Sequence, residues 1–323
     1  MIGFALRRLV SMVMVLFALS VLVFLIFFAT PGIDPARKMA GRNATPETLA
    51  AIRASFGLDR PLPVQYAKMM NRIVITRDIE SYSNRGVRVI PEIMAAAPVT
   101  FSLVFGAAVI WIVASIAIGL LAAALRGTMW DPLLMAIALI GISIPVFWLG
   151  EVANLATQQR WHDTPLFSWV PPLGYTALSE DPVLWFKHLV IPWIVLSVLF
   201  VGFYARVLRS DLIESETEDY VRTARAKGLS ERRVLVVHQL RASMITFVSL
   251  FGLDFAALVA GGALLVEVVF GLPGVGRLTY LSLSGLDLPV IMATVLYGAF
   301  FIVVASAVID ILYAWLDPRT RTQ

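Results

Sequence analysis

The chain has 323 residues, of which 59% are hydrophobic and only 15% are charged, and its mean hydropathy is +0.82. Soluble domains carry about 25% charged residues, so this composition indicates an integral membrane protein. The formal charge of +4 therefore bears on orientation in the membrane. It does not indicate nucleic-acid binding, because no polar domain is left to hold a duplex.

Cysteine is absent from the chain, which excludes disulfides, thiolate nucleophiles and cysteine-ligated metals. The three histidines, His162, His188 and His238, lie far apart in the sequence and match no metal-ligand spacing. We interpret them as interfacial or loop residues and expect no metal site.

A charge-free segment from Leu9 to Ile33 follows Arg7 and Arg8. A spanning helix needs about 20 apolar residues, and this run is too long for a signal peptide and lacks a small-residue cleavage site. The sequence therefore predicts a cytoplasmic N-terminus and a retained first transmembrane helix within residues 1–30.

Residues 31–97 are polar, charged and rich in turn signals, and they predict a small external (periplasmic-side) helical subdomain. Thr45-Pro46-Glu47 has the pattern of a helix start, and Gly57 that of its end. After a proline-rich turn, Val64–Ile75 predicts a second short helix.

Five further apolar segments predict five more spans, which gives an all-α integral membrane protein with six transmembrane helices. The segments are Val99–Leu125, Asp131 to about Ala156, Lys187–Leu208, Met244–Phe270 and Leu288–Ile309. The core they form covers residues 98–316 and includes a loop at 210–243, and residues 317–323 form a cytoplasmic tail.

Basic residues support this topology, since cytoplasmic loops are enriched in lysine and arginine. With both termini inside, the short outer loops carry only Arg160, Lys187 and Arg277. The cytoplasmic side carries Arg7, Arg8, Arg126, Arg206, Arg209, Arg222, Arg225, Lys227, Arg232, Arg233, Arg241, Arg319 and Arg321.

The fifth predicted span contains two acids, Asp254 and Glu267. A central acid is costly in a bilayer, so we expect both to face protein or a water-filled path. For Asp254, pore lining and a structural hydrogen bond between helices both stay open, whereas we favour the structural interpretation for Glu267. Asp254, Phe255 and Glu267 are the candidate residues of a translocation path.

The loop between the fourth and fifth spans has the pattern of a helical hairpin. Ser215-Glu-Thr-Glu218 fits a capping box, residues 220–227 are good helix formers, and Gly228 predicts a left-handed end. Ser230 and Glu231 then predict the start of another helix. The arginines fit a basic loop that obeys charge bias or touches anionic lipid, but small residues such as Thr223 and Ala224 favour close contact with another protein.

Residues 220–230, Tyr-Val-Arg-Thr-Ala-Arg-Ala-Lys-Gly-Leu-Ser, resemble the cytoplasmic coupling loop of permease subunits of binding-protein-dependent ATP-binding-cassette importers, in the dipeptide/oligopeptide/nickel branch. The general pattern of that loop is Glu-Ala-Ala, three residues, Gly, nine residues, then Ile-x-Leu-Pro. Aligned on Gly228, it puts Arg222 at the Glu position and Arg241 at the Pro position, so both ends of the general pattern differ here. Further segments similar to the family are residues 5–9, 57–66, 271–277 and 316–319.

The resemblance implies a non-catalytic subunit of the bacterial cytoplasmic (inner) membrane that pairs with a homologous second permease. It also implies two P-loop ATPase subunits, which carry ATP and magnesium, an external substrate-binding protein, and no cofactor in this chain. The first choice of substrate is di- or oligopeptides, with nickel chelates, glutathione or other small solutes as alternatives. The residues implied to contact the ATPase are Asp219, Tyr220, Arg222, Thr223, Ala224, Arg225, Ala226, Lys227, Gly228 and Leu229.

Other chemistry finds little support in the sequence. No Gly-Lys dipeptide occurs, so no Gly-x-x-x-x-Gly-Lys-Ser/Thr phosphate loop exists in the chain. A secondary transporter using Asp254 and Glu267 is an alternative, although no internal repeat of the kind such proteins show is evident. A membrane enzyme is disfavoured because no His-Glu-x-x-His or Gly-x-Ser-x-Gly motif occurs.

Overall fold

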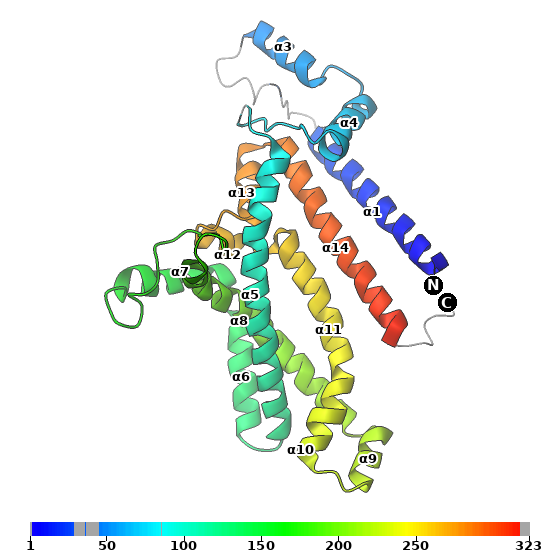
Figure 1. Ribbon diagram of the computed structural model, residues 1–323, viewed down its shortest axis with the longest axis vertical. Helices are drawn as coiled ribbons and strands as arrows, with labels where there is room; N and C mark the ends of the chain where they lie inside the picture. Colours follow the sequence, from blue (N-terminus) through cyan, green and yellow to red (C-terminus); the bar gives the residue numbers. More distant parts are fainter. Residues whose placement is uncertain (1, 29–35, 37–44, 85, 317–323) are drawn as a thin grey trace. The chain divides into compact units, whose positions relative to one another are not determined.

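The computed structural model describes residues 2–28, 36, 45–84 and 86–316, and its regular elements there are helices (Figure 1). The one strand-like pairing in these ranges is an isolated antiparallel bridge between Glu80 and Arg88. The chain divides into two compact units. One unit holds residues 1–100, 256–264 and 273–323, and the other holds residues 101–255 and 265–272.

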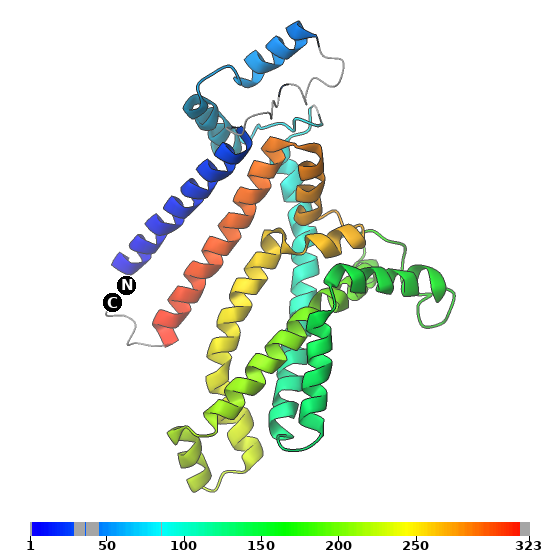
Figure 2. The ribbon, with the colours of Figure 1, turned by 180° about the vertical axis from the view of Figure 1, so that it is seen from behind.

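The described helices of the first unit come from several separate parts of the chain. They are α1 (Ile2–Phe28), α3 (Pro46–Phe56), α4 (Leu62–Met70), η1 (Asn71–Ile75), the start of α5 (Val89–Ala124), η4 (Leu258–Gly262), α13 (Val275–Gly285) and α14 (Leu288–Leu316). α1 and α14 pack side by side (Figures 1 and 2). The rest of the predicted Leu9–Ile33 span and the predicted tail at 317–323 lie outside the described residues.

Residues that follow α1 pack back onto it through aromatic and apolar side chains. Tyr66 of α4 lies 5.4 Å from Phe24 of α1, centroid to centroid, and its hydroxyl is 2.6 Å from the Ser20 hydroxyl. The predicted helix after Pro46 is confirmed as α3, and the predicted second helix is confirmed as α4 with η1. The small helical segment is therefore anchored to the first apolar helix.

A buried acid, Asp287, joins the segment before α5 to the turn before α14. Its carboxylate accepts hydrogen bonds from the Ser81 hydroxyl, from the Tyr82 amide at 3.0 Å and from the Ser83 amide at 3.1 Å. Asp287 is 3% exposed and Ser81 also 3%, and burial raises the pKa of the Tyr82 hydroxyl well above its usual value. We call these four residues the Asp287 cluster.

The second unit holds the remainder of α5 and the helices on either side of the long central loop. They are α6 (Trp130–Ser143), α7 (Val146–Asn154), η2 (Leu155–Arg160), α8 (Pro182–Ser215), α9 (Asp219–Ala226), α10 (Glu231–Arg233), η3 (Val234–Gln239), α11 (Leu240–Ala257) and α12 (Leu264–Val269). α6 and α8 pack together along their lengths, and Arg209 of α8 binds both carboxylate oxygens of Asp131 of α6 at 2.6 Å.

An aromatic cluster fills the centre of this unit. Trp111 of α5 is fully buried, stacks on Phe200 of α8 at 4.4 Å, and lies 4.9 Å from both Tyr204 of α8 and Phe251 of α11. Buried aromatic pairs contribute beyond the area they bury, so this cluster holds three long helices in one packed group.

Four helices are long and apolar enough to cross a membrane: Val89–Ala124, Pro182–Ser215, Glu231–Gly262 and Leu288–Ile309. The bent pair of α6 with α7 and η2 makes a fifth if it counts as one span. α1 has 27 residues and contains a shorter apolar stretch at Val10–Ile26. The predicted all-helical membrane architecture is thus confirmed, with four to five candidate spans among the described residues.

The third predicted span, Asp131 to Ala156, was wrong as a single straight helix. The chain bends by 90° between α6 and α7, where Ile144 has φ −85° and ψ 123°. Pro145 follows Ile144, and the residue before a proline is driven out of the helical region. The proline therefore ends α6 at Ser143.

The fifth predicted span, Met244–Phe270, is also interrupted. Gly261 has φ +113°, which a residue with a side chain rarely adopts, and α12 starts as a new helix at Leu264. Glu267 belongs to this separate helix. The start of the second span also differs, because α5 begins at Val89 and not at Val99, and Pro91 is tolerated in its first turn.

Candidate functional site

The loop between α8 and α11 folds as a short helical hairpin. α8 ends at Ser215, α9 covers Asp219–Ala226, and α10 and η3 lead into α11 (Figure 1). The prediction of a helix over residues 220–227, followed by a second helix from Ser230, is confirmed. We call residues 215–239 the hairpin.

The predicted capping box at the start of α9 was wrong. Ser215 is 9% exposed and its hydroxyl donates to the Leu212 carbonyl at 2.8 Å, so it completes α8 and does not cap α9. Glu218 holds the N-cap position without a capping side-chain bond. The sequence pattern failed because α8 extends seven residues past the predicted end at Leu208.

The end of α9 matches the prediction closely. Gly228 has φ +76°, its amide donates to the Arg225 carbonyl at 2.9 Å, and the Leu229 amide donates to the Ala224 carbonyl at 3.4 Å. These two bonds form a Schellman motif. The left-handed glycine therefore turns the chain back so that Leu229 folds under the helix.

The inner face of α9 is apolar and packs on the hairpin itself. Val221 and Ala224 are 0% and 5% exposed, and they form a cluster with the buried Val234 of η3 and with Leu229. The interpretation of Ala224 as a contact for another protein was therefore wrong: its small side chain lets α9 lie close to η3. This packing fixes the orientation of α9.

The outer face of α9 is exposed and carries most of the residues predicted to contact a partner. Thr223 is satisfied within the helix, since its hydroxyl donates to the Asp219 carbonyl at 2.8 Å. The exposed residues are Asp219, Tyr220, Arg222, Thr223, Arg225, Ala226, Lys227 and Gly228. The face combines the aromatic ring of Tyr220 with small and basic side chains.

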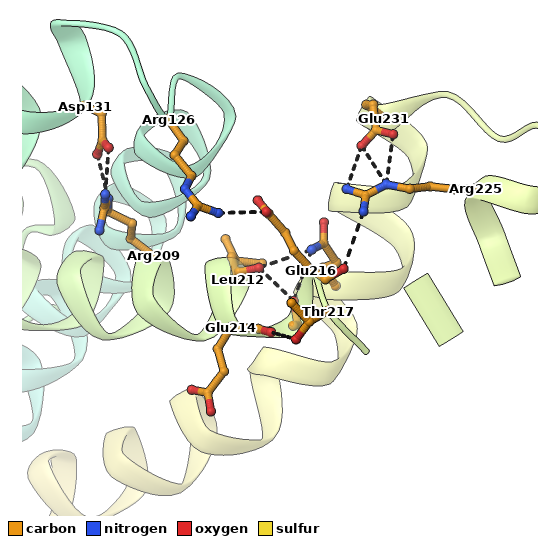
Figure 3. Close-up of polar contacts among 11 residues, drawn as sticks. Arg126, Asp131, Arg209, Leu212, Glu214, Glu216, Thr217, Arg225 and Glu231 are labelled. Carbon is orange, nitrogen blue, oxygen red and sulfur yellow. Dashed lines mark hydrogen bonds and ion pairs between the residues drawn. The ribbon is translucent and has the colours of Figure 1, made fainter. Parts of the chain in front are cut away.

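A chain of charged residues runs along one side of the hairpin (Figure 3). Arg225 donates to both carboxylate oxygens of Glu231, at 3.0 Å from Nε and 3.0 Å from Nη2, and its Nη1 reaches the Glu216 carbonyl at 3.4 Å. The Glu216 carboxylate accepts from Arg126 Nη1 at 2.7 Å. The bond to Glu231 raises the pKa of the Arg225 guanidinium above its usual value, so Arg225 is charged at any physiological pH.

Gln239 fixes the far end of the hairpin. Its buried amide donates to the Leu212 carbonyl and to the Ser215 hydroxyl, both at 3.1 Å. The end of α8 is thereby joined to η3, immediately before α11 begins. No local sequence pattern signals the pairings of Gln239 with the end of α8 and of Glu216 with Arg126, because these partners lie 24 to 90 residues apart.

The structure places the three candidate path residues in different surroundings. Asp254 of α11 accepts a hydrogen bond from the buried Tyr204 hydroxyl at 2.6 Å, which favours a structural role between helices. Phe255 is half-buried and lies 5.6 Å from Phe251. Glu267 is fully buried in α12, consistent with the structural interpretation favoured for it.

Within the described ranges, no group of three or more His, Cys, Asp or Glu side chains is arranged to hold a metal ion. Two of the histidines use Nδ1 for backbone carbonyls: His162 lies 2.9 Å from Thr157 O, and His188 lies 2.9 Å from Leu184 O. These contacts suit structural histidines at helix ends.

Comparison with known families gives matches along nearly the whole chain. Residues 115–322 match the model described as "Binding-protein-dependent transport system inner membrane component", and residues 1–104 match the model of the corresponding N-terminal region. A putative peptide transport system permease protein of Brucella abortus is 35% identical over 325 residues, covering 99% of both chains.

Two further relatives agree with this match. The dipeptide transport system permease protein DppB of Escherichia coli is 33% identical over 339 residues, with 99% of each chain covered. A probable peptide ABC transporter permease protein of Sinorhizobium fredii is 33% identical over 320 residues, covering 98% of this chain and 99% of its own. Such proteins are non-catalytic, multi-pass permease subunits of the inner membrane, and the apolar helices described above fit that class. The chain belongs to the family of inner-membrane components of binding-protein-dependent transport systems.

Proposed function

We propose that the chain is a permease subunit of an ATP-driven importer, forms half of a translocation pathway for di- or oligopeptides, and couples to a separate ATPase through the helix at 219–230. The observation that carries the coupling role is the two-sided character of α9. Its inner face is fixed on the hairpin by Val221 and Ala224, while its outer face is exposed. The family supports the importer class, and the relatives named for peptides support the substrate.

The packing of the hairpin explains how a force could reach the membrane helices. α9 is held to η3 by its apolar face, and η3 is held to the end of α8 by Gln239. Displacement of α9 by closure of an ATPase dimer would therefore move the cytoplasmic ends of α8 and α11 together. Such movement of packed helices as rigid bodies is a common route of conformational switching.

We propose that the chain has six spans, with α1 as the first and the bent α6–α7 pair as the third. Both termini lie in the cytoplasm, and residues 31–97 lie outside, as the distribution of basic residues favours. Family membership implies ATPase and substrate-binding partners. We further propose a homologous second permease, two ATPase subunits that bind the ATP and magnesium, and no cofactor in this chain.

The gradient-driven alternative is not retained, because the family works with a binding protein and an ATPase, and because Asp254 is engaged by Tyr204. Asp254, Phe255 and Glu267 remain candidate path residues of the proposed pathway. No observation on this chain favours nickel chelates or glutathione over peptides, so peptides named for the relatives remain the proposed cargo.

A substitution on the outer face of α9 tests the coupling role. Thr223→Trp adds bulk to an exposed position and should leave the hairpin folded, whereas a bulky residue at Ala224 would disrupt its packing. We expect Thr223→Trp to abolish co-purification of the ATPase subunits and uptake of radiolabelled dialanine into proteoliposomes. Ser284→Trp, at an exposed position of α13, is the matched control and should retain both ATPase binding and uptake. Retention of both ATPase binding and uptake by Thr223→Trp would overturn the coupling proposal.

A further inference from the structure

Glu216 occupies a position where three segments meet. It is the first residue after α8 and adopts helical angles, φ −59° and ψ −28°. Its carboxylate accepts from Arg126, which lies in the turn between α5 and α6, 90 residues away in sequence. Its carbonyl accepts from Arg225 of α9. One residue thus contacts both α9 and a turn that is remote from α9 in the chain (Figure 3).

The contacts link Glu231, Arg225, Glu216 and Arg126 in series, and we call these four residues the Glu216 relay. Its two end contacts are ion pairs, and the middle contact joins Arg225 to the backbone carbonyl of Glu216. Its side chains are partly exposed: 50% for Arg126, 35% for Glu216 and 38% for Arg225. Exposed ion pairs contribute little to folding stability. Stability is therefore a poor explanation for the arrangement, and the geometry instead limits how far α9 can move without the α5–α6 turn.

We propose that Glu216 is a positioning residue that carries the displacement of α9 to the turn between α5 and α6. This role rests on the proposed coupling role of α9 and adds a path by which the movement of α9 reaches the α5–α6 turn. α8 and α11 receive the movement through the covalent chain and the hairpin packing, and α6 and α5 pack on α8 through Asp131 and Trp111. The Arg126–Glu216 contact adds a direct link from the hairpin to the α5–α6 turn. Without this contact, the turn would lag behind α9, and the pathway would open incompletely.

Distance measurements on the assembled transporter test this proposal. The chain has no cysteine, so cysteines introduced in it, with cysteine-free partner subunits, carry the only spin labels. A first label pair, Thr128→Cys with Ser230→Cys, reports the α5–α6 turn against the turn that follows α9, away from the outer face of α9; both positions are exposed. A second pair, Ser230→Cys with Ser168→Cys, reports whether this end of α9 moves at all. Both pairs are measured by double electron–electron resonance with and without ATP and vanadate.

With Glu216 intact, we expect ATP and vanadate to change the second distance and to leave the first unchanged. In Glu216→Ala and in Arg126→Ala the first distance should also change, and the double variant should match either single one, because both remove the same contact. Dialanine uptake should fall by about three- to tenfold in these variants with ATPase subunits still bound, a size typical of coupling networks. Glu218→Ala removes an adjacent exposed carboxylate that makes no capping bond and should behave as the intact chain.

The two distances distinguish a failure of the coupling role of α9 from a failure of the Glu216 relay. If the second distance does not respond to ATP and vanadate in the intact chain, α9 is not moved by the ATPase and the proposed coupling role is wrong. If the second distance responds but the first behaves identically in the intact chain and in Glu216→Ala, the coupling role stands and the relay is wrong.

Discussion

Asp287 and Glu216 are both acids that join distant parts of the chain, but they do so in opposite surroundings. Asp287 is 3% exposed and accepts from one hydroxyl and two backbone amides. Glu216 has a side chain 35% exposed, and its carboxylate accepts from Arg126. A buried carboxylate with fixed donors allows one arrangement, because breaking it leaves polar groups without water. An exposed pair adds little to folding stability, so Glu216 can link two segments that move together without holding the whole fold in one arrangement.

The largest effect is expected from Asp287→Ala. Removing this carboxylate leaves the buried Ser81 hydroxyl and Tyr82 amide, and also the Ser83 amide, without their acceptor. We expect a loss of about 3 kcal/mol in the free energy of unfolding, measured by denaturation in detergent micelles. Asp78→Ala is the matched control from the same segment, since Asp78 has a side chain 52% exposed, and it should lower the free energy of unfolding far less, because exposed ion pairs contribute little. Equal losses for the two variants would show that the Asp287 cluster does not hold this segment.

An intermediate effect is expected from Gly228→Ala. No atom lies within 4 Å of the position that a Cβ would take, so the penalty is purely that of the left-handed backbone, about 1 kcal/mol. Amide hydrogen exchange over residues 219–234 should therefore become about fivefold faster. Gly228→Asn should have a smaller effect because asparagine tolerates this conformation better. Faster exchange in the asparagine variant than in the alanine variant would contradict the backbone explanation.

The smallest effect is expected from Arg225→Ala. The Arg225–Glu231 pair is exposed, so its loss should lower the free energy of unfolding by only about 0.5 kcal/mol. The difference should vanish near 1 M salt, where screening extends to about 3 Å. Arg222→Ala removes a looser contact, 3.7 Å from Asp219, and should have no measurable effect. A loss above about 2 kcal/mol for Arg225→Ala would mean that the relay is structural.

Local sequence signals predicted local structure well in this chain. The start of α3 at Pro46 and the end of α9 before Gly228 followed from residue types that cap helices. Four of the six predicted apolar segments coincide with helices long enough to cross a membrane. Pro145 and Gly261 mark in the sequence the two places where predicted spans are interrupted. The apolar composition of each whole segment hid these two residues.

Features that depend on distant partners could not be predicted. Ala224 has the same small side chain whether it faces a partner or its own loop, and only the position of Val234 decides between the two. Ser215 and Glu218 fit a capping pattern, yet the longer α8 uses Ser215 for itself. The carboxylate of Glu216 likewise pairs with Arg126, and no sequence pattern links two residues 90 positions apart.

The bend at Ile144 and Pro145 has a consequence for how the bilayer meets this subunit. α6 has 14 residues, or about 21 Å of helix, against a hydrocarbon layer of about 30 Å. Backbone groups freed at such a corner cannot be solvated by acyl chains. Irregular backbone at membrane depth is tolerated where protein buries it or where it lines a water-filled space, so a bilayer-spanning subunit has to turn this corner away from the acyl chains.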